Sequence, residues 1–160
     1  MATPKIVPRA DGEGGIGTAS LKWANVFCDA LNVGTPKVTG IQSIIIAVSD
    51  ESTLLTTGTA KVTFRMPYAF TLTAVRASVN TAPTGSVLTV DINEAGSTIL
   101  TTKLTIDASE KTSTSAATAA VIGGAGPALA DDAEMTVDID GVGSTVAGKG
   151  LKIYLIGYQT

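Results

Sequence analysis

The sequence predicts an all-β protein, an antiparallel, jelly-roll-like β-sandwich that follows a short extended, intertwined N-terminal segment. The first indication is composition, because the chain is 44% hydrophobic but only 4% aromatic and 16% charged. Its many threonines and valines favour extended structure. The second is that short runs of alternating apolar and polar residues recur between turn residues from Ile41 onward. The third is that residues 1–40 show neither this alternation nor a helical period.

We expect the chain to have two parts. Its 160 residues suffice for one ordinary core and a small appendage. The first part contains several prolines, a glycine cluster between Gly12 and Gly17 and one short apolar motif, so it cannot bury a core of its own. We therefore expect an attachment and shaft segment at residues 1–40 and the sandwich at residues 41–160.

About eight strands are expected in the second part, each with one buried and one solvated face. The strand that contains Phe64 ends before Pro67, which has no amide hydrogen to donate. In the next run the inward phase shifts by one residue near Thr73–Ala74, which predicts a β-bulge. The alternation places these side chains in the core: Val62, Phe64, Met66, Phe70, Leu72, Val75, Ala77, Val79, Leu88, Val90, Ile92, Leu104, Ile106, Met135, Val137, Ile139, Leu151, Ile153 and Leu155.

Two stretches of similar sequence predict a repeated element. They are TVDINEAGSTI at Thr89–Ile99 and TVDIDGVGSTV at Thr136–Val146, and each resembles a strand, a turn and a new strand. We therefore expect the same hairpin twice, in keeping with the two Greek keys of a jelly roll. Residues 108–133 lie between them and are small and polar, apart from a short strand expected at Val121–Ile122. This segment is expected to form the most variable surface.

Charge and hydropathy exclude several partners. The formal net charge is −3, so the basic patch that nucleic-acid binding needs is missing, and no nucleic-acid partner is expected. No apolar run approaches the ~18 residues of a membrane span, so no membrane insertion is expected. The N-terminal residues lack the apolar region of a signal peptide, and we expect synthesis in a cytoplasm. Cys28 is the single cysteine and has no intrachain disulfide partner.

Residues Gly12–Gly17 match the G-x-G-x-x-G pattern of dinucleotide-binding loops. The context differs, because no buried strand precedes the glycines and no helical period follows them. The first acid beyond them, Asp29, also comes too early for the usual spacing of ~20 residues. We interpret them as turn glycines and expect no cofactor.

Carboxylate and amide oxygens alternate along two predicted strands, from Asp91, Asn93 and Glu94 and from Asp138 and Asp140, and Asp131 and Asp132 add two more carboxylates. Clustered oxygens of this kind suit Ca²⁺, but neither run forms a twelve-residue EF-hand loop. We interpret them as solvated strand faces that lead into turns, with an adventitious cation site as the alternative.

We expect no enzymatic activity. The chain has no histidine, which removes the commonest general base and metal ligand. The adjacent acids Asp50 and Glu51 lie in a polar segment with nothing nearby to raise the pKa of either one. No catalytic or metal-binding residue is therefore predicted.

The single tryptophan lies in the N-terminal segment, which has no core to receive it. Large aromatic side chains bury about 150–250 Å² each, and exposing that much apolar surface is unfavourable. Identical neighbours around a symmetry axis could supply the missing core. The expected oligomer interface is Ile16, Leu21, Trp23, Val26, Phe27 and Leu31. The alternative is that Trp23 folds back onto the sandwich of its own chain.

Asp11–Gly34, DGEGGIGTASLKWANVFCDALNVG, resembles a segment that recurs in the tail fibres of tailed bacteriophages. That segment has a glycine-marked turn, Ile/Leu-Gly-Thr/Ser, small residues, Lys/Arg-Trp and an apolar pair. The corresponding positions are Gly15, Ile16, Gly17, Thr18, Ala19, Ser20, Lys22, Trp23, Val26 and Phe27. The stretches FRMPYAFTLTAVRASV and DDAEMTVDID also resemble terminal domains of phage fibre and other virion proteins.

The resemblance implies a structural virion protein, a short homotrimeric tail fibre located in the virion tail. It also implies partners: two further copies of the chain, tail or baseplate proteins at the N-terminal end, and host-surface contact through the sandwich, with a glycan left open. The chain has one copy of the tryptophan motif instead of a long repeated shaft, so a trimeric capsid decoration or cement protein is the alternative. The loops expected to contact a receptor are residues 80–86, 107–118 and 123–133.

Overall fold

The computed structural model describes residues 40–160. The expected interface residues Ile16, Leu21, Trp23, Val26, Phe27 and Leu31 lie outside this range, as do the Gly12–Gly17 cluster and Cys28. The division of the chain near residue 40 and the interface itself therefore stay predictions.

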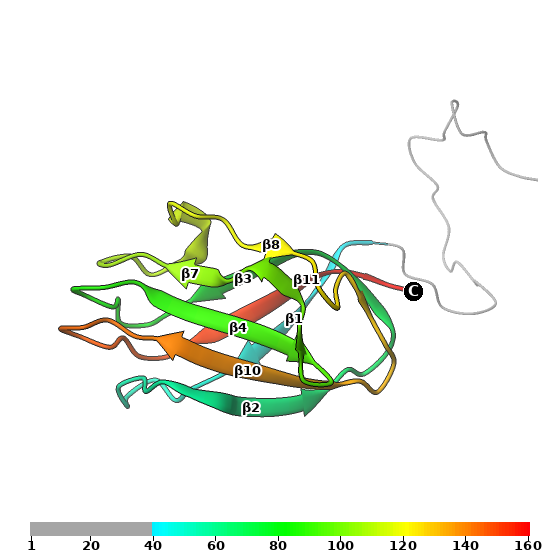
Figure 1. Cartoon of the computed structure of the whole chain (residues 1–160), viewed down its shortest axis with the longest axis horizontal. Helices are drawn as coiled ribbons and strands as arrows, with labels where there is room; N and C mark the ends of the chain where they lie inside the picture. The colour runs from blue at the N-terminus through cyan, green and yellow to red at the C-terminus, as the bar shows by residue number, and fades with distance from the viewer. Residues whose placement is uncertain (1–39) are drawn as a thin grey trace, which may run out of the picture. The chain divides into compact units, whose positions relative to one another are not determined.

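Residues 40–160 form an all-β structure of antiparallel sheets, as the sequence predicts (Figure 1). The only helical element in this range is a single 3₁₀ turn, η1. Within the described residues no helix is long and apolar enough to cross a membrane. The elements are β1 (Gln42–Ala47), β2 (Gly58–Arg65), β3 (Phe70–Ser78), β4 (Leu88–Glu94), β5 (Ser97–Thr98), β6 (Leu100–Thr102), β7 (Leu104–Ile106), η1 (Ser113–Ser115), β8 (Val121–Ile122), β9 (Ala128–Leu129), β10 (Glu134–Gly141) and β11 (Lys152–Gln159).

Two sheets form the sandwich. The first, here called the β1 sheet, has the order β1-β11-β3-β9, and the second, the β2 sheet, has the order β2-β10-β4-β5, with β7 also paired to β4. Strands β6 and β8 make a separate two-stranded ribbon. The consecutive strands β1, β2, β3 and β4 alternate between the two sheets, and β10 and β11 do the same, which is the winding of a jelly roll.

The described residues contain eleven strands where the sequence led us to expect about eight. The difference comes from two- and three-residue strands in the 97–129 region, which are too short to show an alternating pattern. The expected strand at Val121–Ile122 is confirmed as β8.

One apolar core fills the space between the sheets. All of the side chains predicted to face inward are buried, except that Val62 and Phe64, which belong to the edge strand β2, are partly buried. Phe70 and Leu155 from the β1 sheet and Ile92 and Met135 from the β2 sheet have no exposed surface. Both sheets therefore contribute to the same core.

The predicted bulge in β3 is confirmed. Leu72 pairs with Gly157 of β11 and Ala74 pairs with Ile156, so that Thr73 has no cross-strand partner. The extra residue reverses the facing of all later residues in the strand. Both the early and the late apolar residues of β3 therefore face the core.

The prediction of a repeated hairpin is wrong for the second copy. In the first copy β4 and β5 form a tight hairpin whose loop residues, Ala95 and Gly96, have φ values of 47° and 81°. In the second copy Val142 stands at the place of Ala95, and β-branched residues strongly disfavour positive φ. The chain after β10 instead runs into a long loop, in which Val146 forms a bridge with Thr84.

Candidate functional site

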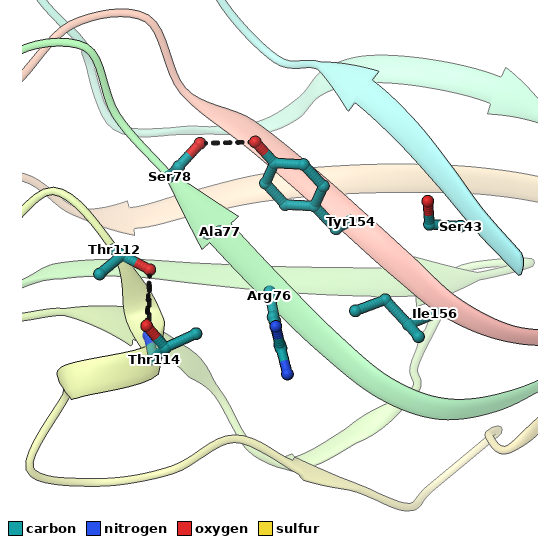
Figure 2. A pocket seen from close by; sticks show the side chains of 8 residues that line it. All are labelled: Ser43, Arg76, Ala77, Ser78, Thr112, Thr114, Tyr154 and Ile156. Atoms are coloured by element: carbon teal, nitrogen blue, oxygen red, sulfur yellow. Dashed lines mark hydrogen bonds between the residues drawn. The ribbon is translucent and has the colours of Figure 1, made fainter. Parts of the chain in front are cut away.

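A groove lies on the outer face of the β1 sheet, beside the turn η1 (Figure 2). Its volume is about 400 Å³. Strands β1, β3 and β11 and the η1 segment supply its lining: Ser43, Arg76, Ala77, Ser78, Thr112, Thr114, Tyr154 and Ile156.

The floor of the groove follows from strand register. Ile45 of β1, Tyr154 of β11 and Arg76 of β3 pair in one row across the three strands. In the next row Ile156 lies between Ser43 and Ala74. Alternation turns these side chains outward, while Ile153 and Leu155 of the same strand β11 enter the core.

Tyr154 occupies the middle of this floor. Its hydroxyl forms a 2.9 Å hydrogen bond with the Ser78 hydroxyl of the neighbouring strand (Figure 2). A ring held at its hydroxyl and flanked on both sides by other strands keeps a defined orientation. The groove therefore has a preformed aromatic surface.

Arg76 is exposed beside Tyr154. None of the ion pairs or hydrogen bonds within residues 40–160 uses its guanidinium. By comparison, Arg65 on β2 donates to the Asp132 carbonyl at 2.9 Å and lies 3.5 Å from the Glu134 carboxylate. Arg76 is thus a cation that the described residues leave without a counter-ion.

The η1 segment forms one wall and is fastened to β3. The Ala77 amide donates to the Ser113 hydroxyl at 2.8 Å, and Ser78 forms a bridge with Thr112. The Thr112 hydroxyl accepts from the Thr114 amide at 3.2 Å and so caps the turn. These contacts place the two threonine hydroxyls at the rim of the groove (Figure 2).

The acidic residues of β4 and β10 form a different kind of site. Our interpretation of them as solvated faces is wrong for Asp91 and Asn93, which are only 6% and 9% exposed. Asp91 accepts from the Thr98 hydroxyl at 2.6 Å and from the Ile92 amide at 2.9 Å. The Asn93 side-chain amide donates to Asp138 at 3.0 Å. The sheet pairing that brings these residues together is not visible in the sequence.

A lysine balances this acidic cluster. The Lys103 ammonium lies 2.7 Å from the Asp140 carboxylate and 3.1 Å from that of Asp91. The hydrogen bonds to Asp140 and then to Asp91 raise the pKa of Lys103 above its usual value. Within residues 40–160 no group of three or more potential ligands could hold a metal ion. The cation in this cluster is the protein's own ammonium.

The adjacent acids Asp50 and Glu51 are also engaged. Asp50 accepts from the backbone amides of Thr53 at 2.6 Å and Ser52 at 2.7 Å, and these hydrogen bonds lower its pKa well below the usual range. Glu51 pairs with Lys152. Asp50 is therefore ionised at neutral pH and closes a turn.

The three loops expected to contact a receptor differ in position. The 107–118 loop contributes Thr112 and Thr114 to the groove. The 80–86 loop instead pairs with the 146–149 segment, and the 123–133 loop carries β9, which pairs with β3. Neither of these two loops lines the groove.

Sequence reasoning missed the floor of the groove. No role is predicted for Arg76 or Tyr154 from the sequence, because nothing in it shows that β11 lies between β1 and β3. The available signal was the alternation itself, which turns an arginine, a tyrosine and Ser43 away from the core.

No family model, curated protein or solved structure matches the chain. The indications of function are therefore the sequence motifs and the chemistry of the groove.

Proposed function

We propose that the chain is a structural virion protein, a short homotrimeric phage tail fibre. Residues 1–40 attach to the tail or baseplate and form the trimeric shaft, and the sandwich is presented to the host surface. The protein has no enzymatic activity and acts mechanically and by adhesion.

The observation that carries this proposal is the closed core of residues 40–160. Both sheets fill it with their own side chains, of which Phe70, Ile92 and Leu155 are fully buried. Trp23 and Phe27 are not needed to complete it. Apolar side chains in a short glycine-rich segment then gain most from association with identical segments.

The proposal is tested by light scattering of the full chain and of Trp23→Ala. We expect three times the chain mass for the wild type and a smaller mass for the variant. The matched control is Leu54→Ala, which removes an apolar side chain that is 51% exposed in the sandwich, and it should stay trimeric. A monomer mass for the wild type would overturn the trimeric fibre.

A capsid decoration protein is distinguished by location and copy number. Gold-labelled antibody on intact virions should mark the tail, with a handful to tens of copies in each particle. Labelling over the capsid shell, with hundreds of copies, would contradict the tail assignment and leave the trimer intact.

A further inference from the structure

We infer that the groove on the β1 sheet binds an acidic saccharide, whose carboxylate or phosphate group is held by Arg76. The inference rests on the proposed function, because it names the ligand class for the host-surface contact. The observation behind it is a cation without a counter-ion in a preformed groove that is otherwise lined by hydroxyl and apolar groups.

The charge of the groove is opposite to that of the chain. The full sequence has a net charge of −3, yet none of the eight lining residues is acidic and Arg76 is basic. A guanidinium presents N–H donors in a planar fork that matches a carboxylate or a phosphate in a bidentate manner. An anionic group at this position would neutralise Arg76, which is the only charged residue in the lining of the groove.

The rest of the lining suits a sugar ring. Four hydroxyl side chains surround the floor, from Ser43, Ser78, Thr112 and Thr114, and each hydroxyl both donates and accepts. Those of Ser78, Thr112 and Thr114 already take part in hydrogen bonds, which hold them in place while capacity for more remains. Saccharides carry the same paired donor and acceptor groups.

The apolar part of the floor is suited to the face of a sugar ring that carries C–H groups. Tyr154 and Ile156 are neighbours on β11 and turn the same way. An aromatic ring with its hydroxyl already bound offers apolar surface to the carbon-bound hydrogens of a sugar ring. Because the Ser78 hydrogen bond fixes the ring before binding, little conformational entropy is lost on binding.

The size of the groove limits the ligand. A volume of about 400 Å³ is at the low end for small-molecule sites and suits roughly one or two sugar units. An open groove of this size gives weak binding at each site. The three grooves of a trimer compensate for this weak binding through avidity, if the spacing of the surface saccharides allows the grooves to bind at the same time.

The test is isothermal titration of the full chain with three soluble saccharide probes and with inorganic phosphate. Tetragalacturonate carries carboxylates, mannose 6-phosphate carries a phosphate, and maltotetraose is neutral. We expect at least one acidic probe to bind about tenfold more tightly than maltotetraose, and the tighter acidic probe identifies whether the anion is a carboxylate or a phosphate. Inorganic phosphate should bind more weakly than the sugar phosphate, because it makes no contact with the floor.

Variants locate the site. Arg76→Ala should weaken the binding of the acidic probe about tenfold to a hundredfold, the loss expected for charge-assisted hydrogen bonds. Arg76→Lys keeps the charge without the fork and should lie in between. The matched control is Arg65→Ala, on β2 in the other sheet, which should leave binding within about twofold. Far-UV circular dichroism verifies that each variant is folded.

Two results would overturn the inference: no binding of either acidic probe, or binding that Arg76→Ala leaves unchanged. The titration reports on the groove in any assembly state, whereas the fibre proposal depends on mass and virion labelling. A trimeric tail protein whose groove binds neither acidic probe therefore refutes only the groove inference. A monomer that binds an acidic sugar through Arg76 refutes only the fibre.

Discussion

Lys103 is the side chain that neutralises and stabilises the acidic cluster of the β2 sheet. A buried carboxylate costs free energy unless hydrogen bonds and a counter-ion replace the water that it has lost. Asp91 receives both, from Thr98 and the Ile92 amide on one oxygen and from the Lys103 ammonium on the other.

We predict that Lys103→Met lowers the free energy of unfolding by about 1–3 kcal/mol, because it leaves Asp91 without its counter-ion. Urea denaturation measures the change. Arg65→Met is the control, since its ion pairs are solvent-exposed and should be worth less than about 1 kcal/mol. Equal losses for the two variants would contradict the special role of Lys103.

The same pair has a definite pH dependence. Because the folded-state pKa of Lys103 is raised, its contribution to stability is complete below the unfolded value of about 10.4. It is lost as the pH rises through the folded-state pKa. The difference in stability between wild type and Lys103→Met should therefore shrink in strongly alkaline buffer and stay constant near neutral pH.

At the residue scale the sequence predicts well which side chains point into the core, but it predicts poorly which residues contact one another. Alternation alone identifies Ile92 and Leu155 as inward residues, because strand geometry turns every second side chain to the same side. It cannot predict that Asp91 is buried. The counter-ion of Asp91, Lys103, comes from the chain segment between β6 and β7, and alternation within β4 contains no information on that contact. The sequence also cannot predict that Arg76 has no counter-ion among the described residues, because this depends on which side chains the neighbouring strands place beside it.

At the scale of elements, the bulge in β3 fixes how β3 and β11 fit together. Gly157 of β11 faces Leu72 at the bulge. A Cβ atom at this glycine would collide with the Thr71 carbonyl oxygen and lie 2.8 Å from the Phe70 ring. The close approach of the two backbones therefore requires glycine.

We predict that Gly157→Ala destabilises the sandwich by about 1–3 kcal/mol, through displaced backbone at the bulge. The matched control is Gly141→Ala in β10, where the nearest atom to the added Cβ is 3.6 Å away. That variant should change stability by less than about 0.5 kcal/mol. Thermal unfolding of both proteins gives the comparison, and a harmless Gly157→Ala would mean that the strands separate there without cost.

The bulge and the failed hairpin show what local sequence determines. The alternation of apolar residues within β3 shifts by one position, and this shift is present in the sequence of β3 itself, so the bulge near Thr73 was predictable. The two stretches share TVDI and Gly-Ser-Thr but differ in the turn between them, where Val142 stands at the place of Ala95 and only Ala95 adopts positive φ. The difference between the two stretches therefore lies in the turn residues, and these determine whether a tight hairpin can form.

At the scale of the whole molecule, long-range pairing dominates. The first described strand, β1, pairs with the last, β11, and β2 pairs with β10. Alternation and turn residues predict a sandwich, but the order of strands depends on pairings between distant residues that no short pattern contains. This is why the fold class was predictable and the groove, which needs β1, β3 and β11 together, was not.

The closed core gives a prediction that separates folding from assembly. A fragment of residues 40–160 contains both sheets and every buried side chain of the core. We expect it to unfold in urea at the same midpoint as the sandwich of the full chain and to scatter light as a monomer, whereas the proposed function predicts a trimer for the full chain. The reason is that the proposed shared core consists of side chains before residue 40.

A trimeric fragment would contradict this division and transfer the assembly surface to the sandwich. The place to search would then be the outer side of β1 and the residue before it, where Ile45 and Ile41 are 59% and 79% exposed; among the described strands, β1 is the edge of its sheet. Ile45→Lys would then dissociate the fragment, because a charge at the centre of an apolar contact is strongly unfavourable. In a fragment that is already monomeric the same substitution leaves the mass unchanged, so the two outcomes identify which part of the chain holds the copies together.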